Sequence, residues 1–365
     1  MNPDFPRFNT SSFGVLPMKL LKIAGLAAAA ALIQSPLSAT AQTTVAFAGF
    51  GGPLQEAMVG QMFADAPKLN IRIKEDRNGF WTGVKAHLMA KAPGWDLTEV
   101  GFARCEQAAQ ADLIQNIDYG IVDKSKIPAA LAQQKYVGVY TFTYGLTYQT
   151  KKYGANGPRS WADFFDVQKF PGRRTMLADG LYALEIALIA DGVAPADVYK
   201  TLRTPAGVDR AFAKLEKIKP HVAVWYKSSG QAMQLMRDGE VDMGLISNAR
   251  AQSVVKDGTP LTFVWDKAFI DTECLMVPNN AQNPKVVMQL INSALDPKNQ
   301  AAFAAASLYG PTNLKAFEGG MIPAASMEWL PSAPQNLNKQ VWADQKWYAS
   351  PEAEAAYQRF AKFLQ

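Results

Sequence analysis

The stretch TTVAFAGFGGP, residues 43–53, decides the fold class of this chain. Its first six residues are mostly apolar or β-branched, which is typical of a buried strand. The glycines and the proline that follow indicate a turn, and a helical pattern then covers residues 54–64. The stretch therefore predicts a strand, a turn and a helix, which is the repeating unit of an α/β fold.

A long β-prone stretch, residues 137–150, separates two series of such units and suits a segment that leaves one lobe for another. The predicted strands are residues 43–48, 69–74 and 97–101, then 174–178, 222–226 and 241–246. The predicted helices are residues 54–64, 81–89 and 105–111, then 181–190, 229–236 and 248–256. This alternation favours crossover helices, so we expect two lobes, each a mostly parallel sheet flanked by helices, with a ligand cleft between them.

The chain is expected to divide into five segments. They are a signal peptide at 1–41, the first part of lobe 1 at 42–145, lobe 2 at 146–268, a return segment to lobe 1 at 269–322 and a C-terminal helical tail at 323–365.

The first segment has the three parts of a secretory signal peptide. A basic stretch begins at Met18, an apolar run covers residues 23–33, and small residues end at Ala41. The apolar run is shorter than the roughly 20 residues that a membrane-spanning helix needs. We therefore expect translation to start at Met18, cleavage near Ala41 and a soluble exported protein.

The composition of the chain excludes several classes of protein. Of its 365 residues 48% are hydrophobic and 19% are charged, as in a folded globular protein. Two histidines and two cysteines are too few for a typical structural zinc site or an iron–sulfur cluster, so we expect no metal or other cofactor. The 37 basic and 32 acidic residues are interspersed, which argues against a nucleic-acid partner. After export, Cys105 and Cys274 form either a disulfide or two buried thiols, and the sequence leaves both open.

The candidate binding residues lie in the turns after the predicted strands. Ligands of open α/β sheets bind beyond the carboxyl ends of the strands, where helix N-termini and short polar side chains offer hydrogen bonds. The candidates in these turns are Phe50, Gly51, Gly52, Phe102, Asp179, Tyr182, Ser229, Ser247 and Asn248. The simpler interpretation of the polar ones is that they cap helices, which is compatible with ligand contact.

Six short motifs occur in an order that resembles a known family. They are FGGP (50–53), WDL (95–97), WADF (161–164), GEVDMGL (239–245), FIDT (269–272) and YGPTN (309–313). Together they resemble the periplasmic solute-binding proteins of ABC importers, in the spermidine/putrescine branch of the type 2 class. The resemblance covers most of the mature chain. It implies two α/β lobes that close over a small solute and deliver it to a membrane permease, and we expect a monomer.

The same resemblance implies an amine-binding site. Asp271 falls where the family's amine-binding aspartate lies, and Phe269 and Phe50 fall where aromatic side chains enclose the ligand's carbon chain. The sequence departs from the family at Tyr182, where a second acid is expected, and at Ser247, where a tryptophan is expected. A shorter or singly charged amine, or an amino-acid derivative, therefore fits better than spermidine.

Two alternatives stay open. In the first alternative, Arg104 or Arg250 binds a carboxylate or phosphonate group of the solute, which is then an organic acid, a phosphonate or a zwitterion rather than an amine. An exported α/β enzyme is the other alternative. The S-x-x-K spacing at Ser253 lies inside a predicted helix without its partner motifs, and Leu54 replaces the third glycine of a dinucleotide-binding turn. We therefore expect no enzymatic activity.

Overall fold

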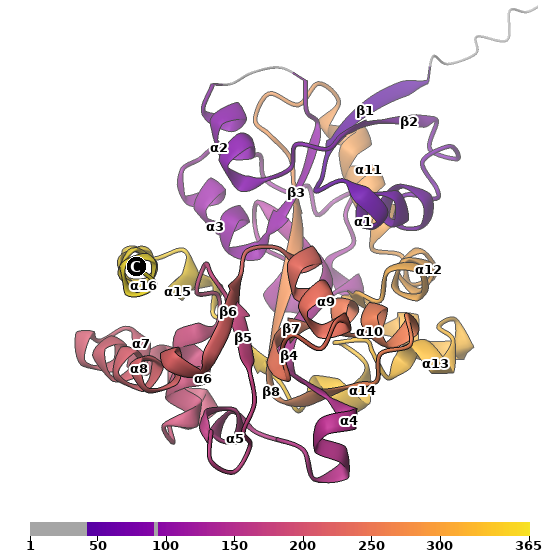
Figure 1. Cartoon of the computed structure of the whole chain (residues 1–365). Helices are drawn as coiled ribbons and strands as arrows, with labels where there is room; N and C mark the ends of the chain where they lie inside the picture. Colours follow the sequence, from indigo (N-terminus) through magenta and orange to yellow (C-terminus); the bar gives the residue numbers. More distant parts are fainter. Residues whose placement is uncertain (1–41, 91–93) are drawn as a thin grey trace, which may run out of the picture. The chain divides into compact units, whose positions relative to one another are not determined.

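The computed structural model describes residues 42–90 and 94–365. The chain separates into a unit at 1–40 and a unit at 41–365, and the fold described below is that of the second unit (Figure 1). The predicted signal peptide and its cleavage site lie outside the described residues. None of the helices in the described ranges is long and apolar enough to cross a membrane.

The strands of the described residues form one mixed sheet in the order β2-β1-β3-β8-β4-β7-β5-β6, with two short strands paired to its centre. They are β1 (Thr43–Ala48), β2 (Ile71–Asp76), β3 (Leu97–Gly101), β4 (Tyr136–Gln149), β5 (Arg174–Leu177), β6 (Val222–Tyr226), β7 (Met243–Ser247), β8 (Leu261–Met276), β9 (Gly310–Pro311) and β10 (Val341–Trp342). The pairs of β1 with β2 and β3, and of β5 with β6 and β7, are parallel. These parallel pairs confirm the predicted alternation at both ends of the sheet.

Helices connect these strands and cover the sheet (Figure 1). The α-helices are α1 (Gly52–Ala57), α2 (Trp81–Met89), α3 (Phe102–Gln110), α4 (Thr150–Tyr153), α5 (Trp161–Phe165), α6 (Ala183–Ala190), α7 (Val198–Leu202), α8 (Pro205–Ile218), α9 (Ser229–Arg237), α10 (Asn248–Lys256), α11 (Pro284–Ala294), α12 (Pro297–Ser307), α13 (Ala324–Met327), α14 (Pro334–Leu337), α15 (Gln345–Tyr348) and α16 (Pro351–Phe363). Local signals explain several starts. The hydroxyls of Ser160, Thr204 and Ser228 each accept a backbone N–H in the first turn of the helix that follows.

Two long antiparallel strands, β4 and β8, join the two ends of the sheet. In the first lobe β8 pairs with β3, in the second lobe β4 pairs with β7, and β4 and β8 pair with each other along their length. The predicted β-prone stretch 137–150 is therefore the connecting strand β4. The centre of the sheet is antiparallel, because the chain returns along β8 beside β4 rather than through a crossover helix.

Each lobe has its own hydrophobic core. The first core includes side chains from Val45 to Tyr140 and from Cys274 to Phe303, and the second includes side chains from Leu146 to Phe269 and from Ala343 to Phe360. Both cores are thus built from two separate stretches of the chain. The chain passes from one core to the other within β4 and β8.

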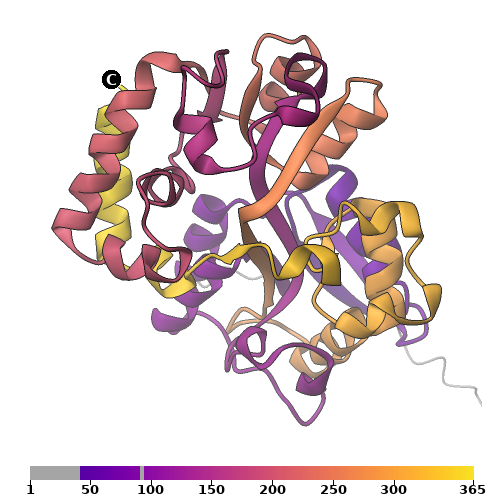
Figure 2. The same ribbon diagram turned by 90° about the horizontal axis from the view of Figure 1, so that it is seen from below.

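The C-terminal segment is a structural part of the second lobe. Strand β10 pairs with β8, and the buried Trp347 and Phe360 belong to the second core. Helix α16 lies beside α8, where the rings of Phe212 and Phe360 are 6.4 Å apart and Arg359 pairs with Asp209 (Figure 2). The segment also reaches the first lobe, because α15 contacts α3.

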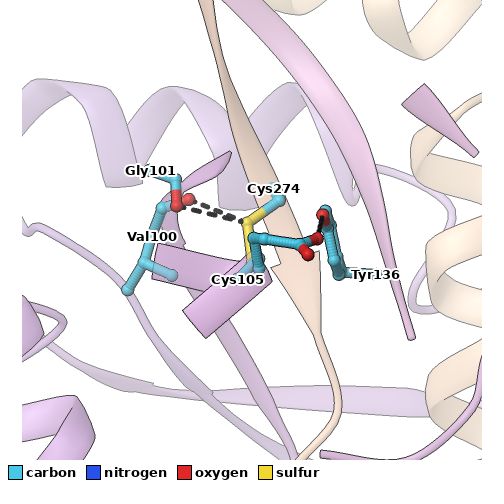
Figure 3. The surroundings of a disulfide bond; sticks show 6 residues. Val100, Gly101, Cys105, Tyr136 and Cys274 are labelled. Atoms are coloured by element: carbon cyan, nitrogen blue, oxygen red, sulfur yellow. Dashed lines mark hydrogen bonds between the residues drawn. A yellow bond between two sulfur atoms is a disulfide. The ribbon is translucent and has the colours of Figure 1, made fainter. Parts of the chain in front are cut away.

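Cys105 and Cys274 form a disulfide, which decides between the two alternatives left open by the sequence. Figure 3 shows the bond between α3 and β8, beside Val100 and Gly101 of β3. Both cysteines are fully buried in the first core. The bond therefore fixes the first helix after β3 to the strand next to β3.

Candidate functional site

Two adjoining chambers lie between the lobes and together form one cleft. The Asp271 chamber has a volume of about 470 Å³ and is lined by Trp81, Phe102, Ala103, Arg104, Asp271, Gln345, Tyr348, Glu354 and Tyr357, among others. The Arg250 chamber has a volume of about 940 Å³ and is lined by Gly51, Gly52, Phe80, Ser229, Ser247, Arg250, Ser253, Lys256 and Tyr309, among others. Phe50, Phe142, Asp179, Leu181 and Glu273 line both. Volumes of this size suit a small organic molecule.

Eight of the eleven predicted site residues line this cleft. They are Phe50, Gly51, Gly52, Phe102, Asp179, Ser229, Ser247 and Asp271. All but Asp271 lie just after the carboxyl ends of strands or at the end of one, where parallel strands present their turns. Gly51 and Gly52 have φ angles of 77° and 63°, which non-glycine residues rarely adopt, so these two residues bring bare backbone to the cleft wall.

The other three predicted residues lie behind the wall, which corrects the expectation that they face the ligand. Tyr182 and Phe269 are fully buried with their rings stacked 5.2 Å apart, and Asn248 is buried as well. Phe269 shares a face of β8 with Asp271, but the ring of Tyr182 covers it. Asn248 accepts the backbone N–H of Thr143 and donates to two backbone carbonyls, so its amide is used structurally.

The carboxylate of Asp271 is held by three donors. Its Oδ2 accepts the hydroxyl of Tyr182 at 2.9 Å, and its Oδ1 accepts the amide of Gln345 and the backbone N–H of Thr272, each at 2.6 Å. Burial raises the pKa of Asp271 to about 6, although these hydrogen bonds oppose the rise. Asp271 thus has a fixed orientation and little hydrogen-bonding capacity to spare.

Glu273 is the acid in the cleft that the sequence analysis missed. It lines both chambers, and its Oε2 is buried without a hydrogen-bond partner among the described residues. Burial raises its pKa well above the usual value, and the nearby Glu99 and Asp271 raise it further. Side chains two positions apart on a strand share a face, so the spacing of Asp271 and Glu273 was a signal that could have identified it.

Two arginines lie at the cleft, in different states. Arg104 is exposed, donates to Gln107 Oε1 at 3.0 Å and lies 5.8 Å from the ring centre of Trp81. Arg250 is partly buried, and within the described ranges its guanidinium makes neither a hydrogen bond nor an ion pair. Its positive charge acts on the pKa values of Tyr144 and Tyr309, as does the negative charge of Glu273. Arg250 is therefore the cleft arginine whose guanidinium has no hydrogen-bond partner among the described residues.

The cleft has the composition of a site for a polar organic molecule. Aromatic side chains, the carboxyl group of Glu273, the guanidinium of Arg250 and exposed backbone meet in it. No group of three or more potential metal ligands is present among the described residues.

The sequence and the fold both match known solute-binding proteins. A family model of bacterial extracellular solute-binding proteins matches residues 58–332. A gamma-aminobutyric acid-binding protein of Pseudomonas aeruginosa is 31% identical over 93% of this chain and 94% of its own length.

Two solved structures extend this similarity to the fold. An ABC transporter substrate-binding protein from Bradyrhizobium japonicum USDA 110 superposes with a TM-score of 0.83 and 36% identity, over 88% of this chain and 100% of that one. The PBP MotA from A. tumefaciens B6, solved in complex with glucopine, gives a TM-score of 0.78 and 30% identity over 87% and 100%.

These matches confirm the family that the six motifs resemble, and they cover both lobes and the cleft between them. The chain belongs to the bacterial extracellular solute-binding proteins and is the periplasmic substrate-binding component of an ABC transporter, which binds a small solute and passes it to a membrane permease.

Proposed function

We propose that the cleft captures a small zwitterionic amino acid or amino-acid derivative, whose ammonium group binds Glu273 and whose carboxylate binds Arg250. One observation carries the proposal: a carboxyl group and a guanidinium, neither of them paired with another residue in the described ranges, line the same chamber. A charged group removed from water is costly unless it is paired, so a guest that pairs with both gains binding energy at each end.

The other cleft residues have supporting roles in this proposal. Asp271 and Asp179 add negative potential at the ammonium end, while Phe50 and Phe142 lie where the chambers join and flank the apolar part of the guest. Ser229 and Ser247 offer hydroxyl groups in the chamber of Arg250, beside the bare backbone of the glycine turn.

The relatives support the chemical class. The gamma-aminobutyric acid-binding relative is named for a molecule with one ammonium and one carboxylate, and it aligns over nearly the whole chain. The structural relative MotA holds glucopine. We extend the class to this chain, and leave the individual molecule to experiment.

The rest of the proposal concerns how the protein works. The lobes close over the guest and release it chemically unchanged to the permease. The mature chain begins after Ala41. It acts as a monomer. Edman sequencing of the exported protein is expected to begin at Gln42, and an N-terminus before Ala39 would contradict the cleavage site.

A second candidate is an anion alone. Lys256 lines the chamber of Arg250, so a carboxylate or phosphonate without an amine finds two cations there. The two candidates differ in whether the amine is needed.

The first prediction tests this difference by calorimetry. Gamma-aminobutyric acid is expected to bind, and butyrate and butylamine to bind at least about 100-fold more weakly, because each lacks one charge. Glu273→Gln and Arg250→Gln are each expected to weaken binding by about 2–5 kcal/mol, since the partner charge is left buried and unpaired.

The matched controls are Glu216→Gln and Arg359→Gln, which change the same residue types on α8 and α16 outside the cleft. Both should bind like the unaltered protein. If butyrate binds as tightly as the zwitterion, the anion candidate is correct, and if all three probes fail, mass spectrometry of the ligand that co-purifies with the protein gives the class directly.

A further inference from the structure

Glu99 is a buried carboxylate beside Glu273, on the neighbouring strand β3. Strands β3 and β8 are antiparallel with Gly101 opposite Glu273, so Glu99, two residues before Gly101, is the diagonal neighbour of Glu273 on the same face. Asp271 continues the row on β8. Three carboxyl groups therefore follow one another along the part of the sheet that faces the cleft.

Glu99 lies in the interior of the first lobe. Glu99 is fully buried, and its Oε1 accepts the hydroxyl of Tyr140, the residue opposite Glu273 on β4. Burial raises the pKa of Glu99 to about 7, in spite of this hydrogen bond. Two neighbouring buried carboxylates repel each other, which favours keeping a proton on one of them.

The charged and titratable groups that face Glu273 come from every element around it. They are Glu99 on β3, Tyr140 and Tyr144 on β4, Asp271 on β8, Asp179 after β5, Arg250 on α10 and Tyr309 before β9. The tyrosines stay neutral because burial raises their pKa values. The charges of Glu99 and Asp271 raise the pKa of Glu273, and Glu273 forms no ion pair with a described residue.

We infer that Glu99 and Glu273 together retain one proton in the empty cleft and release it when a cationic guest binds, which makes Glu99 a second specificity-determining acid of the site. In this step one carboxyl O–H bond breaks, the guest's ammonium pairs with the resulting carboxylate, and the proton passes to the solvent. A neutral guest has no charge with which to displace the proton, so the pair selects for cations. The pairing with ammonium rests on the proposed function, but the shared proton of the empty cleft does not.

The shared proton is tested without any ligand. Carboxyl carbon chemical shifts of the glutamates are followed by NMR in the ligand-free protein between about pH 4 and pH 9. Glu273 is expected to titrate well above the ordinary range, and Glu99→Gln is expected to lower its midpoint by one unit or more, about a tenfold change in proton affinity. Glu216→Gln should leave it unchanged. A midpoint near that of exposed glutamates in the unaltered protein would overturn the inference, whether or not the variant folds.

The release of the proton is tested with gamma-aminobutyric acid as the probe. Binding heats are measured near pH 6.5 in two buffers of different ionisation enthalpy, from which the number of protons released follows. We expect close to one proton per ligand and an affinity that rises with pH, and a markedly smaller number for Glu99→Gln. Tight binding with no dependence on buffer would refute the inference and leave the proposed function intact. Failure of the probe to bind, together with a raised midpoint by NMR, would refute the proposed ligand class and retain the proton pair.

Discussion

The position of a residue along a predicted strand allowed some of the cleft residues to be identified from the sequence, but not all of them. The turn residues Phe50 and Asp179 could be predicted, because the carboxyl ends of strands are visible in the sequence. Glu273 could not be inferred from the family, because the matching motif ends at Thr272. Tyr182 and Phe269 were placed wrongly at the cleft surface, because tertiary packing alone determines which of two stacked rings covers the other.

A buried acid in the second lobe carries the next prediction. Glu185 on α6 is almost fully buried and accepts the hydroxyl of Tyr348, and burial raises its pKa to about 7 from 4.5. An acid whose pKa is higher in the folded state binds its proton more tightly there, so its contribution to stability is greatest at low pH and is lost as the pH rises from the unfolded value to the folded one.

Glu185→Gln removes this dependence on pH. Relative to the unaltered protein, the variant is expected to gain about 3 kcal/mol of unfolding free energy between pH 4 and pH 8, from a shift of two to three units at about 1.4 kcal/mol each. Urea denaturation at both pH values measures the gain, and Glu216→Gln on the exposed face of α8 is the control. An equal difference between variant and unaltered protein at both pH values would show that Glu185 titrates normally in the fold.

Among the helices and strands, the limits were predicted best for short apolar runs with a turn at each end. Strands β1, β3 and β6 and helices α2 and α10 begin and end where predicted. The first half of strand β8 (Leu261–Met276) is not among the predicted strands, because Asp266 and Lys267 interrupt its apolar pattern, and Lys267 has a φ of 54°. Its pairing with β4 and β10 keeps that half extended, and such long-range pairing leaves no local signal.

The disulfide between α3 and β8 connects a helix and a strand that both contribute residues to the cleft. Cys105 and Cys274 lie next to Arg104 and Glu273 in the chain, so the bond fixes two walls of the cleft to each other. Replacing both cysteines by alanine is expected to lower the unfolding free energy by about 3–5 kcal/mol, since the unfolded chain regains the freedom of a long loop. It is also expected to weaken binding of the zwitterionic probe, because α3 is less firmly held.

Thermal denaturation and calorimetry of the double alanine variant check both parts. Unaltered protein treated with a mild reductant under native conditions is the control, and it should keep its melting temperature because both cysteines are buried. An unchanged melting temperature in the variant would mean that the bond adds nothing to the packing around it.

The two largest hydrophobic cores, one in each lobe, are connected through β4 and β8, and this arrangement predicts a hinge. The pairing of β4 with β8 shifts register between Gly138 and Tyr140 and again between Tyr144 and Leu146, at either side of the point where the strands pass from one core to the other. Irregular pairing weakens the ladder locally, so these positions are where the strands can bend as the lobes close. The two-lobed fold was predicted from the alternation of elements, but the position of the hinge depends on register and could not be.

Closure is measurable in solution. Saturating zwitterionic ligand is expected to reduce the radius of gyration in small-angle X-ray scattering, because the lobes approach each other over the guest. Glu273→Gln at the same ligand concentration should retain the ligand-free value. Identical scattering curves with and without bound ligand would argue against lobe closure.

The distance between the two cysteines along the chain also sets an order of events during synthesis. The partner of Cys105 lies 169 residues further along the chain, after the first of the two stretches that build the second core. A nascent chain that has reached only residue 270 lacks Cys274, and it lacks the second stretch of the first core, which runs from Cys274 to Phe303. The bond can therefore close the first lobe only after the chain has been made past β8, although the first strand of that lobe, β1, is made long before.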